Sequence, residues 1–407
     1  MMKTILPGLC ATTLILLSLI VVYQWALAIV AIGRRPARRA IAHRQSTKFH
    51  VLIPAHNEES GLSSTLQSLM RVRYPKELVD VTVVADRCDD GTAVVARSHS
   101  VPCLERRSGL PGKGATIAWA IDELRKDGTA FDALVVLDAD TIADSALLEA
   151  FDEGFASGHQ VQQAYNYLSN PWETPFTRLI AVTSVLRNSL FYSGKTRIGL
   201  SGMLTGTGMC FSNATIARHG WTALSVGEDW EFSASLLLQS MKIYFNPNAR
   251  VLATESGSLK QASTQRLRWA SGRYAVAAST AWKLCARGIH HRRPYLVDAA
   301  LTLVIPTYST QATLAALALA GAWFVSGPSR WPLLLPWATL VIGSLSAYFL
   351  LGVLLTDAPG KTLLGIALIP VFLPWRMAIE ILGLLGYGRR RWVRTARLSP
   401  VRHKAGQ

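Results

Sequence analysis

Three long stretches of the chain are apolar and almost free of charge. Residues 4–33 and 331–355 contain no charged side chain, and residues 297–325 contain only Asp298. Each stretch is long enough to cross a hydrocarbon core of ~30 Å as a helix. We therefore predict an N-terminal transmembrane helix at 4–33 and two further spanning helices, at 297–325 and 331–355.

A secretory signal peptide is the alternative for the first stretch, because Lys3 precedes it. The stretch is longer than the apolar part of a signal peptide, and an arginine cluster follows it where a small-residue cleavage site would stand. These two features favour a helix that is retained.

A fourth apolar stretch, residues 362–387, is interrupted. Pro370 and Pro374 break it, and Arg376 and Glu380 follow. Because an ion in the middle of a bilayer is costly, we expect a re-entrant or interfacial element here.

Basic side chains cluster directly after the first and the last apolar stretch. They are Arg34, Arg35, Arg38, Arg39 and Arg44, and then Arg389, Arg390, Arg391, Arg394, Arg397, Arg402 and Lys404. Basic segments beside spanning helices stay on the cytosolic side. We expect residues 34–48 and the tail 388–407 to be cytosolic, in a multi-pass protein of the cell membrane.

Between the apolar stretches, residues 48–290 predict a cytosolic α/β domain. Short β-branched runs alternate with segments of helical spacing, which is typical of a sheet of mostly parallel strands. The strands are expected at 50–54, 81–85 and 133–137, and the helices at 61–72, 92–98 and 114–126. Ligands in such sheets bind at the carboxyl ends of the strands, so the polar clusters after these strands should share one crevice.

The composition of the chain limits the classes of molecule that it is expected to bind. The net charge is +16, half of the residues are hydrophobic and 17% are charged. Nucleic acid, anionic lipid and phosphorylated substrates all attract a basic protein, but the basic clusters stand beside apolar stretches, so we expect a membrane and no nucleic acid. The five cysteines have neither zinc-like nor CxxC spacing and are expected to be free thiols.

Two carboxylates, Asp138 and Asp140, follow the third predicted strand. Side chains at positions i and i+2 of a strand point to the same side, and paired carboxylates suit Mg²⁺ or Mn²⁺. Such a metal would neutralise a diphosphate leaving group. The alternative is a pair that caps a helix, with Thr141 also available.

The other polar clusters are less specific by themselves. Asn57 and Glu58 end the first strand, Asp86 ends the second, and Lys113 stands in a glycine-rich loop that could present N–H groups to phosphate. The structural alternatives are a helix first turn and ordinary turn chemistry. The loop lacks the full P-loop pattern.

Two further clusters lie closer to the second apolar region. Glu228 and Asp229 precede an apolar helix, where one carboxylate could be a general base or a first-turn acid. Downstream, Arg266 and Arg268 could reach phosphates and Trp269 could stack on a sugar, although an interfacial anchor is the alternative.

Taken in order, these motifs resemble the membrane-bound family 2 glycosyltransferases, which include cellulose synthase, hyaluronan synthase, poly-N-acetylglucosamine synthase and ceramide glucosyltransferase. The resemblance covers roughly residues 48–275 and implies a GT-A fold, a Rossmann-like and mostly parallel sheet. The chain differs from the usual pattern of this family in two features. His56 stands where an aromatic residue is common, and few apolar helices follow the domain.

The resemblance implies a role for each matching residue. Asp229 would be the catalytic base, Asp138 and Asp140 the metal ligands, and Asp140 the usual direct one. The nucleotide sugar would contact Pro54, His56, Asn57, Glu58, Asp86, Lys113, Asp138 and Arg268, and the acceptor would contact Gly206, Thr207, Glu228, Gln265 and Trp269.

The implied activity is inverting transfer from a nucleotide sugar, expected to be a UDP-sugar, to a glycan or lipid-linked acceptor in cell-surface or exopolysaccharide synthesis. Mg²⁺ or Mn²⁺ would be the cofactor, and an export protein is a possible partner. Two alternatives remain: a transferase that adds one sugar to a lipid, and an inactive membrane scaffold. A dehydrogenase is disfavoured, because no GxGxxG opens the first strand–helix turn.

Overall fold

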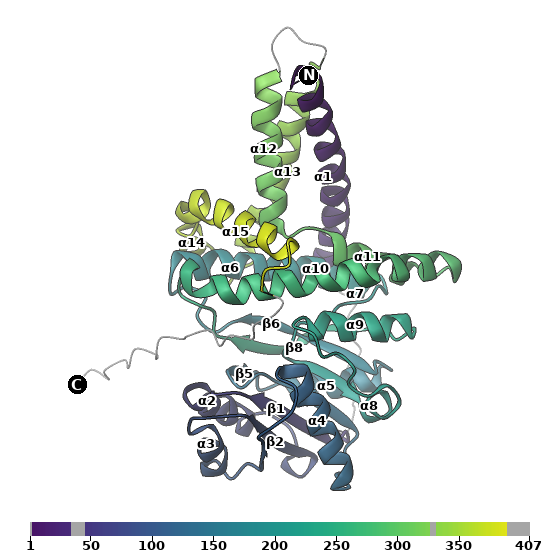
Figure 1. The fold of residues 1–407 in the computed structure, drawn as a ribbon, viewed down its shortest axis with the longest axis vertical. Helices are drawn as coiled ribbons and strands as arrows, with labels where there is room; N and C mark the ends of the chain where they lie inside the picture. Colours follow the sequence, from purple (N-terminus) through teal and green to yellow (C-terminus); the bar gives the residue numbers. More distant parts are fainter. Residues whose placement is uncertain (1, 34–44, 326–330, 389–407) are drawn as a thin grey trace, which may run out of the picture.

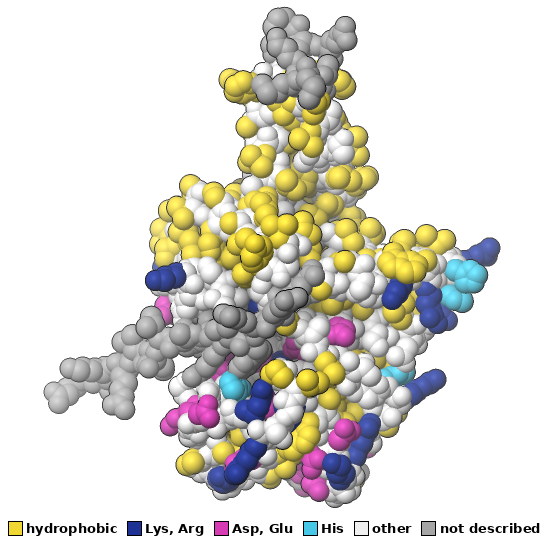
Figure 2. Space-filling model, viewed as in Figure 1, with side chains coloured by type: hydrophobic (Ala, Val, Ile, Leu, Met, Phe, Trp, Pro, Cys, Tyr) yellow, Lys and Arg dark blue, Asp and Glu magenta, His cyan; other side chains and the backbone are white. Residues whose placement is uncertain are grey.

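In a computed structural model, residues 2–33, 45–325 and 331–388 are described. A body built on one sheet carries a layer of long helices, and an upright bundle of helices rises from that layer (Figure 1). Hydrophobic side chains cover the bundle, whereas most charged side chains gather on the sheet-containing body (Figure 2). The charged side chains therefore lie mainly on the part of the chain between the apolar stretches, as the sequence predicts.

The sheet has eight strands in the order β3-β2-β1-β4-β7-β6-β8-β5. β1, β2, β3 and β4 are parallel, β7 is antiparallel to both β4 and β6, and β5 is antiparallel to β8. The strands are β1 Phe49–Ala55, β2 Val79–Asp86, β3 Cys103–Arg106, β4 Ala133–Val136, β5 Thr141–Ala143, β6 Val161–Leu168, β7 Met209–Ser212 and β8 Tyr244–Ala253.

Alternation along β1 explains why this strand is buried on both faces. Phe49, Val51 and Ile53 pack into one hydrophobic core, while Leu52 packs into the core on the opposite face. A parallel strand covered by helices on both sides needs a continuous apolar run, which is what the sequence supplies. The mixed, mostly parallel sheet confirms the predicted α/β class.

The helices of the body cover both faces of the sheet and form the layer above it (Figure 1). They are α2 Glu59–Met70, η1 Lys76–Leu78, α3 Thr92–Ser98, α4 Lys113–Lys126, α5 Leu147–Ala156, α6 Pro175–Val185, η2 Leu186–Tyr192, α7 Ser193–Arg197, α8 Asn213–His219, α9 Glu228–Leu238 and α10 Leu259–His290. The helices expected at 61–72, 92–98 and 114–126 correspond to α2, α3 and α4.

Three of the eight strands were expected, and the others have weak sequence signals. β3, β5 and β7 contain only four, three and four residues. β6 carries Gln162 and Gln163, and β8 carries Asn246 and Pro247. Short or polar strands take their conformation from their neighbours in the sheet, which a local pattern does not reveal.

The remaining helices are mostly apolar. They are α1 Met2–Ile32, α11 Pro294–Val304, α12 Tyr308–Val325, α13 Leu334–Leu354, α14 Pro359–Leu363, η3 Ile366–Leu368 and α15 Ile369–Leu384. Among the described residues, three helical segments are long and apolar enough to cross a membrane, or four if the bent pair α11–α12 counts as one. They are Ile5–Ile32, Leu334–Leu354 and Pro359–Leu384.

The expected helix at 297–325 differs from the structure. It is two helices, α11 and α12, bent by 66°. Pro306 lies at the break and lacks the N–H that would continue the helical hydrogen bonds. Only α12 stands in the upright bundle, while α11 lies in the layer beside α10 (Figure 1).

The interrupted stretch 362–387 comprises the end of α14, η3 and α15, and α15 lies across the base of the bundle (Figure 1). Its ions are paired: Arg376 lies 2.5 Å and Arg273 of α10 lies 3.0 Å from Glu380. This arrangement suits an interfacial element, which stays a prediction. The basic clusters at 34–44 and 389–407 lie outside the described residues.

Candidate functional site

A cavity of about 750 Å³ lies between the carboxyl edge of the sheet and the helices at the base of the bundle. The first three parallel strands that reach it, β1, β2 and β4, end at Ala55, Asp86 and Val136. All but one of the residues singled out from the sequence line this cavity: Pro54, His56, Glu58, Asp86, Lys113, Asp138, Asp140, Gly206, Thr207, Glu228, Asp229, Gln265, Arg268 and Trp269.

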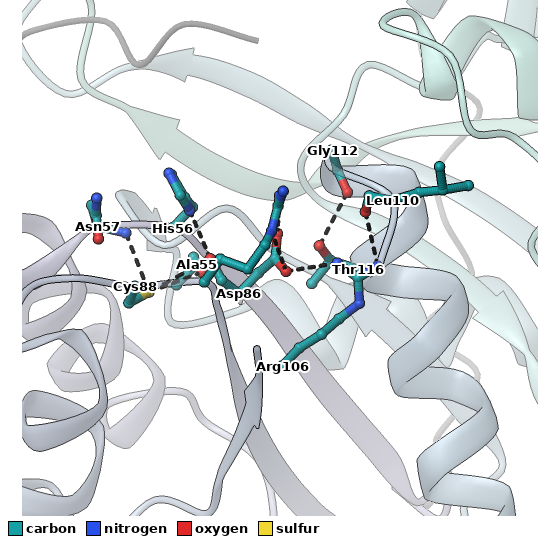
Figure 3. Close-up of polar contacts among 10 residues, drawn as sticks. Ala55, His56, Asn57, Asp86, Cys88, Arg106, Leu110, Gly112 and Thr116 are labelled. Carbon is teal, nitrogen blue, oxygen red and sulfur yellow. Dashed lines mark hydrogen bonds and ion pairs between the residues drawn. The ribbon is translucent and has the colours of Figure 1, made fainter. Parts of the chain in front are cut away.

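The exception is Asn57, which is not among the residues lining the cavity. Its backbone is left-handed, with φ 56°, and its side-chain oxygen accepts a hydrogen bond of 2.8 Å from the N–H of Asp89. Its own N–H donates to Cys88 (Figure 3). Asn57 therefore joins the two loops that follow β1 and β2, and its expected contact with the nucleotide stays a prediction.

Asp86, expected to contact a nucleoside, is held by two arginines that the sequence analysis did not single out. Its carboxylate is 2.8 Å from Arg87 and 2.6 Å from Arg106. Burial would raise the pKa of Asp86, but the two guanidinium groups hold the pKa below its usual value. Asp86 is thus an anion whose position is fixed at the edge of the cavity (Figure 3).

Arg106 also fixes the glycine-rich loop. It donates a hydrogen bond of 2.8 Å to the carbonyl of Leu110, and a Cβ atom at Gly109 would lie 2.6 Å from its guanidinium. Gly109 has φ +106°, a conformation that favours glycine. Because Arg106 ends β3, a four-residue strand, no local pattern indicated this contact.

Lys113 opens α4 and points from the glycine-rich loop to the strand ends. Its ammonium group forms an ion pair with Asp138 and donates a hydrogen bond of 2.7 Å to the carbonyl of Gly206. Burial opposes its charge, yet Asp138 and the nearby Glu228 raise the pKa of Lys113 above its ordinary value. A fixed cation therefore stands among the carboxylates.

Asp138 and Asp140 follow β4 and line the cavity together. The helix-capping alternative does not hold, because β5 begins at Thr141 and α5 only at Leu147. Thr207 orients the turn: its hydroxyl accepts a 3.0 Å hydrogen bond from the N–H of Asp138. The carboxylates are therefore directed into the cavity.

Asp138 and Asp140 suit a divalent metal only if a bound substrate supplies further oxygen atoms to that metal. Among the described residues, no three His, Cys, Asp or Glu side chains are grouped so as to hold a metal ion. Two carboxylates leave most positions around Mg²⁺ or Mn²⁺ for water and phosphate oxygens, as is usual where a metal binds with a nucleotide. The donor set suits a metal that arrives with a diphosphate.

Glu228 and Asp229 form the first turn of α9, facing the cavity. Both side chains are surrounded by protein yet keep partial access to the cavity. Burial raises the pKa of both carboxyl groups above the ordinary range. One oxygen of Asp229 accepts a 2.8 Å hydrogen bond from the N–H of Trp230, which fixes the carboxylate. A buried carboxylate of raised pKa suits proton transfer.

Two glycines bring this turn against α10. A Cβ atom at Gly227 would lie 3.0 Å from the backbone of Gly272, and one at Gly272 would lie 2.9 Å from that of Gly227. The backbones therefore touch where any larger side chain would separate them. This contact sets Asp229 close to the turns of α10 that carry Gln265, Arg268 and Trp269.

Four residues of α10 line the cavity in this segment: Gln265, Arg266, Arg268 and Trp269. Arg266 forms an ion pair with Glu255, and its guanidinium lies 5.0 Å from the ring centre of Trp269. Arg268 is largely buried, and Glu228 and Asp138 are the carboxylates that act on it. These contacts favour the interpretation that Arg266, Arg268 and Trp269 form part of the cavity wall, rather than an anchor at the membrane interface.

The fold and this site define a GT-A glycosyltransferase: a mixed sheet whose strand ends carry paired carboxylates, with a lysine and a buried acid across the cavity. The profile of the family described as "Glycosyltransferase like family 2" matches residues 46–272, more than half of the chain. The chain belongs to this family, and it is a glycosyltransferase enzyme, as the resemblance implied.

Individual relatives are more distant. A probable glycosyltransferase, YdaM of Bacillus subtilis, is 24% identical over 241 residues, which cover 57% of each chain. The poly(ribitol-phosphate) β-N-acetylglucosaminyltransferase TarS of Staphylococcus aureus is 34% identical over 77 residues, 17% of this chain and 13% of its own. The match thus spans little more than half of one curated relative and a small part of the other.

Among solved structures, the chain is similar to a mannosyltransferase of Pyrobaculum calidifontis, determined in complex with GDP-mannose and Mn²⁺. The TM-score is 0.60 at 16% identity, covering 94% of this chain and 99% of the other. The likeness therefore extends beyond the catalytic body to most of the fold, including the helices that flank it.

Proposed function

We propose that this chain transfers a sugar, with inversion, from a nucleotide sugar to a hydroxyl group of an acceptor at a membrane surface. The observation that carries the proposal is the meeting of Asp138, Asp140, Lys113 and Asp229 in one cavity. This set supplies charge for a diphosphate and a base for a hydroxyl group, which are the two requirements of a direct displacement.

The donor would lie along the carboxyl ends of β1, β2 and β4. Asp86 would accept hydrogen bonds from the nucleoside, beside Pro54, His56 and Glu58, which line the same cavity. Lys113 and Arg268 would offset the charge of the diphosphate. We propose UDP as the nucleotide.

Asp138 and Asp140 would hold Mg²⁺ or Mn²⁺ together with the diphosphate. When bound, the metal supplies positive charge to the leaving group. The Mn²⁺ in the structure of the Pyrobaculum calidifontis enzyme is in keeping with this role. Lys113 already pairs with Asp138, so the lysine limits repulsion between the carboxylates before donor and metal bind.

Asp229 would take the proton from the acceptor hydroxyl as that oxygen attacks the anomeric carbon. The nucleoside diphosphate leaves from the opposite face with the bonding electrons. Gly206, Thr207, Glu228, Gln265 and Trp269 would border the acceptor, with the exposed ring of Trp269 available for stacking on a sugar. Glycan synthesis at the cytosolic face of the cell membrane is the setting we propose.

The test uses full-length protein in detergent, Mn²⁺ and a panel of labelled UDP-sugars with GDP-mannose. We expect one donor to yield product, and Asp229→Asn to lower turnover about 10²–10⁴-fold while Mn²⁺-dependent nucleotide binding persists. Wild-type turnover in Asp229→Asn would contradict the role of Asp229. Failure of the wild-type protein to bind any of these nucleotides with Mn²⁺ would contradict the function itself and favour an inactive scaffold.

A further inference from the structure

Basic side chains gather at the C-terminal end of α10 and in the turn that leads to α11. Four cations and two histidines stand there: Lys283, Arg287, His290, His291, Arg292 and Arg293. All six are exposed except Arg293, which is half-buried. The sequence has no Asp or Glu between Glu255 and Asp298, and among the residues that the structure describes none of the four cations forms an ion pair. We call residues 282–293 the hairpin tip.

Ordinary helix chemistry accounts for only part of the charge on the hairpin tip. A helix C-terminus favours cations in its last turn, which accounts for Arg287 and His290. Lys283 lies one turn earlier, and like charges four residues apart, as in Lys283 and Arg287, destabilise a helix. Arg292 has φ 51°, a conformation that favours glycine. The tip therefore carries more positive charge than its helix end stabilises, which suits an anionic surface.

The exposed part of α10 is divided into an apolar row and a basic row. Successive members lie three or four residues apart, so each row follows one face of the helix. The apolar row is Ala278, Trp282, Ala286 and Ile289, and the basic row is Lys283, Arg287 and His290. Trp282 and Ile289 are 66% and 67% exposed, which leaves a large apolar surface uncovered. An apolar face beside a basic face is typical of a helix that lies in the surface of a membrane.

The hairpin of α10 and α11 lies at the base of the bundle. A Cβ atom at Gly288 of α10 would lie 2.9 Å from the backbone nitrogen of Val297 in α11, so the two helices pack closely. Hydrophobic side chains lie on the side of the hairpin nearer to the bundle, and Lys, Arg and His side chains lie at its free end (Figure 2). The tip is therefore at the level where the headgroups of a membrane around the bundle would lie.

We infer that the hairpin tip binds the anionic headgroups of the lipid leaflet that surrounds the base of the bundle. Trp282 and Ile289 enter the boundary between headgroups and acyl chains, while the basic row contacts lipid phosphates. Because α10 also carries Arg268 and Trp269 of the cavity wall, this contact holds the helix that borders the proposed acceptor. The inference rests on the membrane setting of the proposed function and not on the transfer reaction.

The test uses the full-length protein in phosphatidylcholine vesicles that contain a minor fraction of brominated lipid. Bromine quenches tryptophan emission at short range, and the emission of Trp282 is the difference between the wild-type protein and Trp282→Phe. The brominated lipid is either phosphatidylglycerol or phosphatidylcholine with the same acyl chains. One cation near an anionic leaflet contributes roughly fivefold to association, so brominated phosphatidylglycerol should associate with Trp282 at least about fivefold more strongly. High salt should remove most of this preference, because it screens charges at a membrane surface.

The four cations of the tip are then replaced together, as Lys283→Gln, Arg287→Gln, Arg292→Gln and Arg293→Gln. This quadruple variant should lose the preference for phosphatidylglycerol. A variant in which the three arginines of the tip become lysines should keep the preference, because the attraction depends on charge.

The matched control removes four exposed cations from the body. They stand in α3, α4 and α8 and at the end of α2, away from the bundle (Figure 1), and the substitutions are Arg71→Gln, Arg97→Gln, Lys126→Gln and Arg218→Gln. The control changes the net charge by the same amount and should leave the preference unchanged.

Equal association of the two brominated lipids with Trp282 in the wild-type protein would overturn the inference even if the quadruple variant did not fold. Equal losses in the tip variant and the control would assign the preference to the overall charge and overturn the role of the tip. Absence of quenching by either lipid would place the tip in water, where a soluble acidic partner would fit it, and would also overturn the inference. A preference for anionic lipid in a protein that transfers no sugar would leave the tip standing and refute the proposed function.

Discussion

At the scale of single residues, the cavity keeps charged groups in fixed positions by pairing most of them. Asp86 is held by Arg87 and Arg106, and Asp138 is held by Lys113. Glu228 and Asp229 are different, because burial raises the pKa of both. Asp86 and Asp138 thus have cationic partners that stabilise their charge. Asp229, the proposed base, has a raised pKa, which suits the uptake and release of a proton.

The raised pKa of Asp229 predicts the acid side of the pH profile. A base must be deprotonated, so activity is lost as the pH falls through its pKa. We expect this loss at a pH above the ordinary aspartate value of about 3.9, measured as kcat/KM at saturating Mn²⁺. Burial raises the pKa of Glu228 more than that of Asp229, so Glu228 is already neutral at the pH where Asp229 takes up its proton. Glu228→Gln should therefore leave the loss at the same pH, and a loss that moves to lower pH would show that a charge on Glu228 raises the pKa of Asp229.

At the scale of elements, close backbone contacts join helices that are distant in sequence. Gly227 meets Gly272 where α9 crosses α10, and Gly383 of α15 meets Ala270 on α10. α10 is thus in contact with α9, which carries Asp229, and with α15. The positions of Arg268 and Trp269 depend on both contacts.

Gly272→Ala should separate the first turn of α9 from α10. The added methyl group would lie 2.9 Å from the backbone of Gly227, and overpacking of this kind costs about 1–3 kcal/mol. We expect a lower melting temperature and at least tenfold lower turnover, since displacements near 1 Å cost about 10²-fold in catalysis. Gly343→Ala on α13 is the control, because nothing lies within 4 Å of its added Cβ. Equal activity of the two variants would show that the glycine contact does not position Asp229.

At the scale of the whole molecule, buried ions join the sheet-containing body to the apolar helices. Lys195 of α7 lies 2.8 Å from Asp298 of α11, and both side chains are buried. Tyr23 of α1 donates a hydrogen bond to the same carboxylate. Asp298, the only charge in the apolar stretch 297–325, therefore connects three helices at the junction of body and bundle.

Asp298→Asn should destabilise the protein, because it leaves Lys195 buried without an anion. Removing one partner of a buried pair costs about 3–5 kcal/mol, whereas replacing both with apolar residues is often neutral. We expect the double variant Lys195→Met/Asp298→Leu to recover most of the melting temperature lost in Asp298→Asn, measured in the same detergent. A double variant as unstable as Asp298→Asn would show that the pair has another role, since the lysine charge is then absent.

The sequence by itself determined the class of the sheet, the family and most of the polar residues that meet in the cavity. β1, β2 and β4 are β-branched runs, and polar side chains stand at or just after their carboxyl ends. The carboxyl ends of parallel strands meet at one edge of a sheet, so the order of these runs in the chain was enough. The same local patterns marked the apolar stretches and the first turn of α9. A glycosyltransferase of family 2 could be recognised from these residues alone.

Only the tertiary structure decided which partners each of these residues has. Arg106 ends a short strand whose conformation depends on β2, and Asn57 shapes a loop through contacts with residues about 30 positions away. The pairing and the burial of these side chains arise from contacts between elements, and no periodicity along the chain records such contacts.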